Sequence, residues 1–334
     1  MKRTIQFFGM ATLLVASCTL DLQAIVELID SNDLSDSVMG SLTINRSQTA
    51  MIAINNQAPA RHLKTFDLNG NLIASAKFPP AVATAANWED PSWFWTLDTS
   101  GRLIRWNTSL TKPKLVYRIP AGPPSMTRTY CDFDVTKSGV FYITTLETSF
   151  IGHGTEHVQG QLLRYDPANN VAPLTNTWDA GTAGIHNQNV PPGHPLFYLD
   201  RCPRVSVDPV KNVAYVLDHN DDINDLTRVV SYTDQLAVSG QYLLPQVLDA
   251  LDIAVIGSEL AITSHTPGHL PMAALYNWAA PNGPRFESQT PMWSGAGAFF
   301  TAPLLNGNPP GVHLWLDSPM NNDLLSVTKI PVVQ

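Results

Sequence analysis

The chain has 334 residues, of which 44% are hydrophobic and only 14% are charged, so it can bury a sizeable core. Its 26 prolines disfavour long helices, because each proline lacks an N–H donor and clashes with the preceding helical turn. With 28 acidic and 20 basic residues and no Lys/Arg cluster, the chain lacks the basic patch that binding to DNA, RNA or an anionic membrane surface requires.

The first 23 residues predict an export signal. Lys2 and Arg3 precede a mostly apolar segment, Ile5 to Val15, which is too short to span a bilayer. The four residues that end at Cys18, Val-Ala-Ser-Cys, resemble a bacterial lipobox and make Cys18 a candidate for lipidation. The alternative is ordinary signal-peptidase cleavage, for example near Ala24. We therefore expect a secreted protein or, in a bacterium, a periplasmic or cell-envelope lipoprotein, with no transmembrane segment and with residues 24–334 as one domain.

Six imperfect copies of one four-strand unit follow along the rest of the chain. In each copy an aromatic or β-branched strand follows a short apolar strand and often ends in Asp or Asn. The second strand recurs as Met51–Asn55, Trp93–Asp98, Val140–Thr144, Val213–Asp218, Leu260–Ser264 and His313–Asp317. The third strand recurs as Leu63–Asp67, Leu103–Asn107, Leu162–Asp166, Val229–Tyr232, Ala274–Asn277 and Leu324–Val327. Fourth strands are expected at Leu72–Phe78, Leu115–Ile119 and Gln241–Leu244.

Short antiparallel strands in such a repeat are typical of a β-propeller. We predict an all-β, six-bladed β-propeller of four-stranded antiparallel blades. The last copy has only three strands before Gln334, so Ala24–Ile29 is expected to supply the N-terminal strand that closes the last blade and leaves no open sheet edge. Asp and Asn at strand ends are expected to hydrogen-bond their own backbone and start turns. A pair of stacked β-sandwich sheets is the structural alternative.

Two blade openings resemble those of known six-bladed propellers. They are Tyr130–Val135, which precedes Gly139–Tyr142, and Arg204–Pro209. In its pattern, nearly the whole mature chain resembles the NHL, gluconolactonase/senescence-marker and Yellow/royal-jelly propellers. Metal-dependent lactonases of the gluconolactonase type hold a divalent ion in the axial channel with Glu, Asn and Asp side chains. Asp132 is similar to one such position.

Propeller topology places the loops between strands two and three, and those between blades, on one face. The long loops expected there are Glu147–Gly160, Thr175–Pro203, His219–Thr227, Ser264–Pro271 and Pro281–Ala296. Binding residues commonly lie on long loops held by a rigid scaffold. The binding residues predicted on this face are His186, His194, His265, His269 and Trp178. His153 and His157, four residues apart, join Asp132 as candidates for catalysis, and solvated loop histidines are the alternative.

Two clusters predict a cation site and a covalent link. Asp218, Asn220 and Asp222 have the spacing of a calcium loop, and an ordinary acidic turn is the alternative. If Cys18 is lipidated or removed, Cys131 and Cys202 remain as an even pair. Because an exported protein lies in an oxidising compartment, they predict a disulfide, and two buried free thiols are the alternative.

Tryptophans and glycosylation sequons allow further interpretations. Trp88, Trp93 and Trp95 cluster in the sequence, and Trp178, Trp278 and Trp293 lie in or beside expected loops. These tryptophans either stack on a glycan or pack between blades, and packing is the favoured interpretation. The triplets that start at Asn45 and Asn107 are N-glycosylation sequons, which have meaning only in a eukaryotic host.

The sequence carries no nucleophile elbow, P-loop, Rossmann fingerprint or H-E-x-x-H motif. The leading hypothesis is therefore a non-catalytic protein that binds a small molecule, glycan or protein on its long-loop face. The alternative is an enzyme in the axial channel, either a metal-assisted hydrolase of the lactonase kind, an isomerase or a cyclase. A divalent cation such as calcium is the cofactor considered. A scaffold within a larger envelope assembly is a third hypothesis.

Overall fold

The computed structural model describes most of the chain in short segments. They are residues 27–33, 39–47, 49–55, 62–67, 71–77, 81–152, 155–183, 202–208, 211–220, 226–244, 248–256, 259–265, 271–278, 285–291, 297–302, 311–316 and 324–331. The predicted export signal and Cys18 lie outside these residues.

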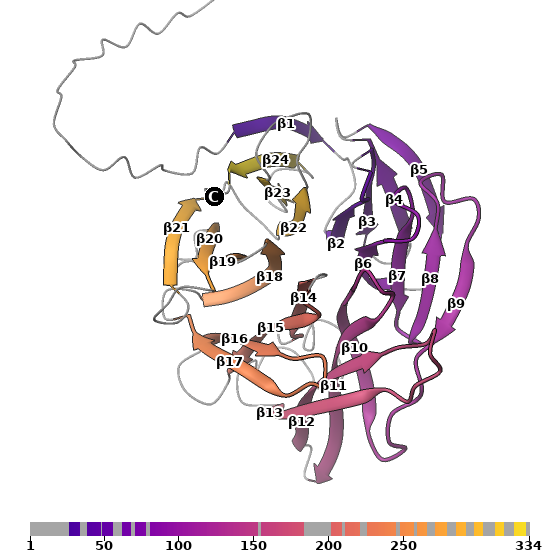
Figure 1. Cartoon of the computed structure of the whole chain (residues 1–334), viewed down its shortest axis with the longest axis vertical. Coiled ribbons are helices and arrows are strands. Elements are labelled where there is room, and N and C mark those ends of the chain that lie inside the picture. Colours follow the sequence, from indigo (N-terminus) through magenta and orange to yellow (C-terminus); the bar gives the residue numbers. More distant parts are fainter. Residues whose placement is uncertain are drawn as a thin grey trace, which may run out of the picture.

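Within the described segments the strands form six four-stranded antiparallel sheets, called blades 1 to 6 below (Figure 1). Blade 1 contains β2 (Met39–Ile44), β3 (Met51–Asn55), β4 (His62–Phe66) and β5 (Leu72–Lys77). Blade 2 contains β6 (Ala81–Ala86), β7 (Phe94–Asp98), β8 (Arg102–Trp106) and β9 (Lys114–Arg118). Blade 3 contains β10 (Thr127–Val135), β11 (Phe141–Gly152), β12 (Thr155–Tyr165) and β13 (Leu174–Ala183).

The remaining strands complete the ring. Blade 4 contains β14 (Arg204–Asp208), β15 (Val213–Asn220), β16 (Leu226–Tyr232) and β17 (Val238–Leu243). Blade 5 contains β18 (Leu248–Ile256), β19 (Glu259–His265), β20 (Pro271–Asn277) and β21 (Arg285–Pro291). Blade 6 contains β22 (Gly297–Ala302), β23 (Gly311–Leu316), β24 (Leu324–Pro331) and β1 (Glu27–Asp33).

The first strand of each blade contacts the first strand of the next blade in chain order, and β22 contacts β2, so the ring closes. The predicted all-β propeller fold is confirmed. The predicted N-terminal closing strand is also confirmed, because β1 pairs antiparallel with β24, with Glu27 opposite Lys329 and Asp33 opposite Leu324. This strand lies later than the expected Ala24–Ile29, and residues 24–26 lie outside the described segments.

Apolar side chains fill the seams between neighbouring blades. In the seam of blades 2 and 3, the Trp95 ring meets the Phe141 ring edge-on, with 5.1 Å between ring centroids. Comparable clusters fill the seams of blades 1 and 2, 3 and 4, and 4 and 5. Trp278 packs edge-on against Tyr215 across the last of these, at 5.2 Å. Packing between blades is therefore the role of these two tryptophans, as the favoured interpretation held.

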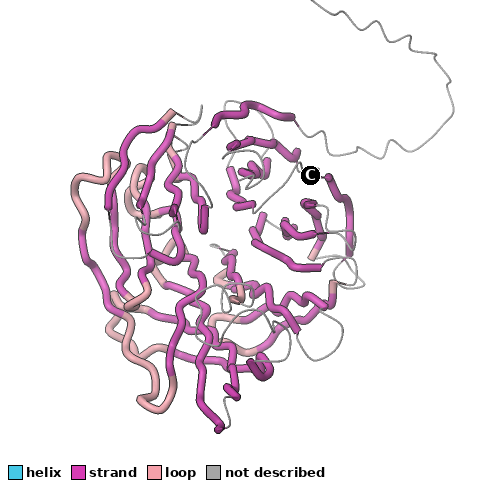
Figure 2. Tube along the Cα trace, turned by 180° about the vertical axis from the view of Figure 1, so that it is seen from behind, coloured by secondary structure: helices cyan, strands magenta, loops and turns pink. Residues whose placement is uncertain are grey.

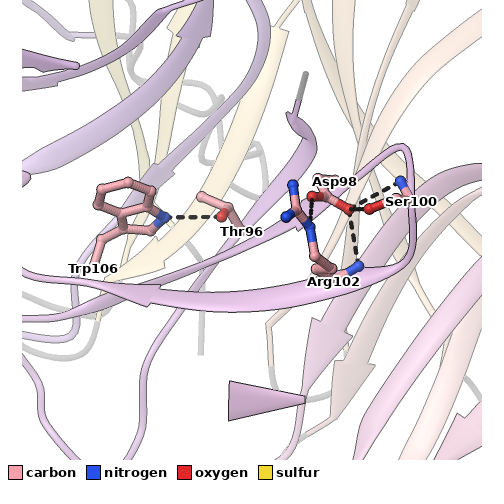
Figure 3. A network of polar contacts seen from close by, with 5 residues as sticks. All are labelled: Thr96, Asp98, Ser100, Arg102 and Trp106. Carbon is pink, nitrogen blue, oxygen red and sulfur yellow. Dashed lines mark hydrogen bonds and ion pairs between the residues drawn. The ribbon is translucent and has the colours of Figure 1, made fainter. Parts of the chain in front are cut away.

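Asp98 ends β7 and organises the turn into β8 (Figure 3). Its Oδ1 accepts hydrogen bonds from the backbone N–H groups of Ser100 and Arg102, both at 2.9 Å, and from the Ser100 hydroxyl at 2.8 Å. Its Oδ2 pairs with the Arg102 Nε. Gly101 supplies the positive φ of 74° that this turn needs.

Third strands end in polar residues that cap the following turn. The side-chain oxygens of Asp67, Asn107 and Asp166 accept the backbone N–H of Asn71 at 2.8 Å, Thr111 at 3.0 Å and Asn169 at 3.4 Å, respectively. The sequence expectation that strand-end Asp and Asn start turns is confirmed at these positions. The side-chain oxygens of these residues are therefore engaged in the fold.

Several expected long loops contain strand instead. The expected loop Glu147–Gly160 is mostly the hairpin of β11 and β12, in which Ser149 lies opposite His157. Strands also take the start of the expected loop Thr175–Pro203, both ends of His219–Thr227 and Ser264–Pro271, and the middle of Pro281–Ala296. The prediction of loops was wrong there because the ladder hydrogen bonds continue past the apolar repeat, into residues whose polarity resembled that of a loop.

Replacing Asp98 with Ala should lower the free energy of unfolding by about 2–4 kcal/mol, because it removes the buried carboxylate that accepts two backbone N–H groups and pairs with the Arg102 charge. Chemical denaturation measures this. Asp90 is the matched control, since its carboxylate bonds Ser92 in an exposed part of the same blade, and Asp90→Ala should cost less than about 1 kcal/mol. Equal losses would contradict a special role for Asp98.

Candidate functional site

The first strand of a blade is a sheet edge, so alternate backbone N–H groups point away from its own ladder. Side chains of the preceding blade accept several of these donors. Ser41 Oγ on β2 accepts the Thr84 N–H of β6 at 3.1 Å, and Ser206 Oγ on β14 accepts the Val255 N–H of β18 at 3.1 Å. Neighbouring first strands are thus joined by side-chain-to-backbone bonds.

Blades 3 and 4 use carboxylates for the same purpose. Asp132 Oδ2 on β10 accepts the Val205 N–H of β14 at 3.0 Å, and Asp134 Oδ2 accepts the Val207 N–H at 2.9 Å. These bonds need acceptors at alternate positions of β10 and donors at alternate positions of β14, which is the period of two facing strands. This seam is therefore built from the blade openings Tyr130–Val135 and Arg204–Pro209 that the sequence singled out.

A disulfide and a hydroxyl strengthen the same seam. Cys131 and Cys202 are bonded, with 5.1 Å between their Cα atoms, so the predicted disulfide is confirmed. Thr144 on β11 donates its hydroxyl to the Pro203 carbonyl at 2.6 Å. Both cysteines are buried, which places the bond inside the protein rather than on its surface.

Asp132 is the group in this seam best suited to acid–base chemistry. Its carboxyl is buried, and burial raises its pKa to about 7. The nearby Arg204 charge lowers the pKa and the Asp252 charge raises it, while the N–H groups of Val205 and Phe133 lower it. Since β10, β14 and β18 supply these three charged groups, three consecutive blades set the protonation of one carboxyl. Such a group exchanges its proton near neutral pH.

Asp134 has a basic neighbour, Arg46, that the sequence did not suggest. Burial raises the pKa of its carboxyl and the Arg46 charge lowers it. Arg46 follows β2 in blade 1, and its guanidinium carbon lies 3.5 Å from the centre of a Trp88 ring in blade 2. Trp88 in turn donates its Nε1–H to the Val135 carbonyl in blade 3 at 2.8 Å. Only folding brings these residues of three blades together.

A metal role for Asp132 stays a prediction. The described residues contain no group of three or more His, Cys, Asp or Glu side chains that could hold a metal ion. Asp132 Oδ2 already accepts a backbone N–H, and the positive charge beside it comes from Arg204.

The predicted calcium loop begins on a strand. Asp218 is buried near the end of β15, and its Oδ2 accepts hydrogen bonds from Arg228 Nε at 2.9 Å and Nη2 at 2.7 Å. Asp98 and Arg102 form the equivalent pair in blade 2, also at the junction of strands two and three. The Asn220 side chain and the whole of Asp222 lie outside the described residues, so the calcium site remains untested.

The candidate histidines are not brought together within the described residues. His157 lies half-buried on β12, opposite Thr182 of β13. His265 ends β19, and its side chain is not described. The other candidates, His153, His186, His194 and His269, lie outside the described residues.

Trp178 has a packing role in the seam of blades 3 and 4. It is half-buried on β13, and its ring lies so close to Gly160 on β12 that a Cβ there would meet a ring atom at 2.2 Å. The ring also lies 6.5 Å from the Tyr232 ring, centroid to centroid. Gly160 is required because no other residue leaves room for the indole. Ligand binding by Trp178 remains a prediction.

A buried ion pair in blade 3 was not foreseen. Glu147 on β11 is 1% exposed and pairs with Arg128 on β10. Arg128 also donates to the Pro120 carbonyl and to Gln161 Oε1, both at 3.0 Å. The second Glu147 oxygen, Oε2, has no hydrogen-bond partner among the described residues. The sequence interpretation missed this pair because it placed Glu147 in a loop, although the aromatic and β-branched residues through Thr148 favour a strand.

Comparisons with known proteins assign the chain to no family. No family model matches the chain, and no curated protein matches it. Among solved structures, Saccharomyces cerevisiae Sqt1 matches with a TM-score of 0.45 and 7% identity, over 92% of this chain and 100% of that one. At this level the match says nothing about function, and the resemblance to NHL-type propellers stays a prediction. In the described residues no helix is long and apolar enough to cross a membrane.

Stability should fall as pH rises because of Asp132. Its folded pKa of about 7 exceeds the ordinary value of 3.8, so between these values the folded state binds more protons than the unfolded chain. The free energy of unfolding should therefore decrease between about pH 4 and pH 7 by on the order of 4 kcal/mol, then level off.

Asp132→Asn should remove this loss, since Asn keeps an oxygen for the Val205 N–H. The variant should match the wild type near pH 4 and exceed its stability near pH 8 in denaturation measurements. Glu89→Gln changes an exposed carboxylate in blade 2 and should leave the pH profile unaltered. An Asp132→Asn protein with the wild-type profile would refute this assignment.

Removing the disulfide in a Cys131→Ala, Cys202→Ala double variant should lower stability by about 2–4 kcal/mol, because the bond restrains a long loop of the unfolded chain. Thermal and chemical unfolding under oxidising conditions measure the loss. The same variant and the wild type should converge when both are unfolded with excess reductant. A gap that persists in reductant would show that packing of the cysteines, rather than the bond, supplies the stability.

Proposed function

We propose that this chain is an exported β-propeller that binds a small molecule, glycan or protein, without catalysing a reaction, on the face that carries the hairpins between strands two and three. The observation that carries the proposal is the length of blade 3. Its strands β11, β12 and β13 have 12, 11 and 10 residues, whereas β7 and β8 in blade 2 have 5 each. Figure 1 shows β11 and β12 running beyond the neighbouring strands.

The base of this extension is well supported. Glu147 pairs with Arg128, which reaches Gln161 on the next strand and the Pro120 carbonyl in the connection from blade 2. Truncating a buried ion pair of this kind is costly, so the pair restrains the hairpin where it leaves the blade. A restrained element loses less conformational entropy on binding, which favours a recognition role.

Binding is favoured over catalysis because three acidic side chains of the described residues are already engaged in structure. Asp98 and Asp218 pair with arginines at turns, and Asp134 accepts the Val207 N–H. Carboxylates that bond arginines and backbone N–H groups stabilise the fold, as expected of a binding scaffold. The fold alone is compatible with either function.

Export is part of the proposal. A buried disulfide is expected in an oxidising compartment, and residues 1–23 have the composition of an export signal. Lipidation of Cys18 and ordinary cleavage near Ala24 remain the two ways in which the mature N-terminus would form.

A second candidate function is favoured by one observation, the pKa of about 7 at Asp132. In that case the protein would be a hydrolase of the lactonase kind, an isomerase or a cyclase, with Asp132 transferring a proton at the propeller axis. Asp132→Asn discriminates the two functions, because it would abolish turnover in an enzyme yet leave binding at the blade 3 hairpin unchanged.

Shortening the hairpin tests the main proposal. Ser149 lies directly opposite His157, so residues 150–156 can be replaced by an Asn-Gly turn without changing the strand register. Wild type and variant are screened by thermal shift against soluble glycans and small metabolites and on a glycan array. A ligand at about 100 times its Kd should raise wild-type stability by about 2.7 kcal/mol and leave the variant unshifted.

The β15–β16 hairpin of blade 4 provides the control on the same face. Asn220 lies opposite Leu226, so residues 221–225 can be replaced by Asn-Gly in the same way. This control variant should keep the ligand response. If a ligand binds the blade 3 variant as tightly as it binds the wild type, the binding site does not lie on the β11–β12 hairpin.

A further inference from the structure

The two N-glycosylation sequons occupy different environments in the folded chain. One starts at Asn45, after β2 in blade 1, and the other at Asn107, after β8 in blade 2. A glycan attached to the side-chain amide needs space outside the fold and an amide that the fold can give up. Asn45 and Asn107 differ both in the space around the side chain and in how the fold uses the amide.

Asn45 is enclosed. It is 0% exposed, its Oδ1 accepts the backbone N–H groups of Thr49 at 2.9 Å and Ala50 at 3.2 Å, and its Nδ2 donates to Thr49 Oγ1 at 3.0 Å. A sugar on Nδ2 would have to leave the interior, and the turn into β3 would lose the cap that satisfies these donors. A chain glycosylated at Asn45 therefore cannot complete blade 1.

Asn107 is open. The residue is half-exposed at the turn from β8 to β9, and the neighbouring Ser109 is exposed. Its Oδ1 accepts the Thr111 N–H at 3.0 Å, and its Nδ2 donates to Thr111 Oγ1 at 3.2 Å, both in an exposed setting. An N-linked amide retains one N–H and its carbonyl oxygen, so attachment leaves the backbone cap of this turn in place.

We propose that Asn107, and not Asn45, carries an N-linked glycan when this chain passes folded through a eukaryotic secretory pathway. The inference rests on the proposed export of the chain. In the transfer, Asn107 Nδ2 forms a bond to the anomeric carbon of a lipid-pyrophosphate-linked oligosaccharide. The bond from that carbon to the pyrophosphate oxygen breaks, and the amide nitrogen loses one proton.

The position of Asn107 also separates the glycan from the proposed binding face. Turns between strands three and four lie on the face opposite the hairpins between strands two and three, because successive strands of a blade are antiparallel. A glycan at the β8–β9 turn therefore leaves the β11–β12 hairpin uncovered. The proposed ligand response of the hairpin should be the same with and without the glycan.

The test uses two substitutions that remove a sequon and keep the asparagine. Ser109→Ala disables the sequon at Asn107. Ser47→Ala disables the sequon at Asn45 and removes the exposed bond between Ser47 Oγ and Thr49 Oγ1, but it keeps all groups that the Asn45 side chain bonds. The full chain is secreted from cultured animal cells, both with its own N-terminus and behind an added secretory leader. The secreted proteins are compared by intact mass before and after peptide-N-glycosidase F, which converts a glycosylated asparagine to aspartate.

Secreted wild type and Ser47→Ala should each carry one glycan, with aspartate appearing at position 107 after the enzyme, and Ser109→Ala should carry none. A glycan on Asn45 in folded, secreted protein, or an unmodified Asn107 in the wild type, would overturn the proposal. Failure of secretion with the native N-terminus but not with the added leader would count against the export proposal alone.

Discussion

The structure depends on how the backbone N–H groups of each blade's first strand find hydrogen-bond acceptors in the neighbouring blade. These strands are sheet edges around the propeller axis, and a buried edge N–H without an acceptor costs about as much as a lost hydrogen bond. Side chains of the preceding blade provide the acceptors, with Ser41 for Thr84, Asp132 for Val205 and Ser206 for Val255. Within the described residues these bonds join blades 1 and 2, blades 3 and 4, and blades 4 and 5, and β1 closes the ring from the N-terminal end.

Using carboxylates for this purpose between blades 3 and 4 has a consequence for charge. Asp132 must remain buried to reach the Val205 N–H, and burial is what raises its pKa to about 7. The disulfide of Cys131 and Cys202 lies at the same seam and restrains the residues on either side. The Asp132 carboxyl therefore both joins two blades and can exchange a proton near neutral pH. For this reason an enzyme acting at the propeller axis stays the second candidate function.

In the other described blades, the Asp and Asn residues at strand ends stabilise turns and hairpins. Asp98 in blade 2 and Asp218 in blade 4 pair with arginines where strand two turns into strand three, and Asn107 caps the turn after strand three. Blade 3 differs from the other described blades in strand length and in one buried ion pair. Only blade 3 combines strands of 10 to 12 residues with a buried ion pair at the base of its hairpin, within the described part of the chain.

The amino-acid sequence by itself determined the second and third strands of each blade and their order, because local alternation and a repeated unit report the period of a strand and how many times it recurs. The even pair of cysteines besides Cys18 also predicted the Cys131–Cys202 bond, whereas β13 and β21 lie in segments that were expected to be loops. The sequence did not reveal where hairpins end, since the polar residues of the β11–β12 extension resemble those of a loop until their ladder is seen. It also could not bring Arg46 to Asp134, or Arg204 and Asp252 to Asp132. Those neighbours come from different blades, and contacts between residues far apart in sequence exist only after the ring has closed.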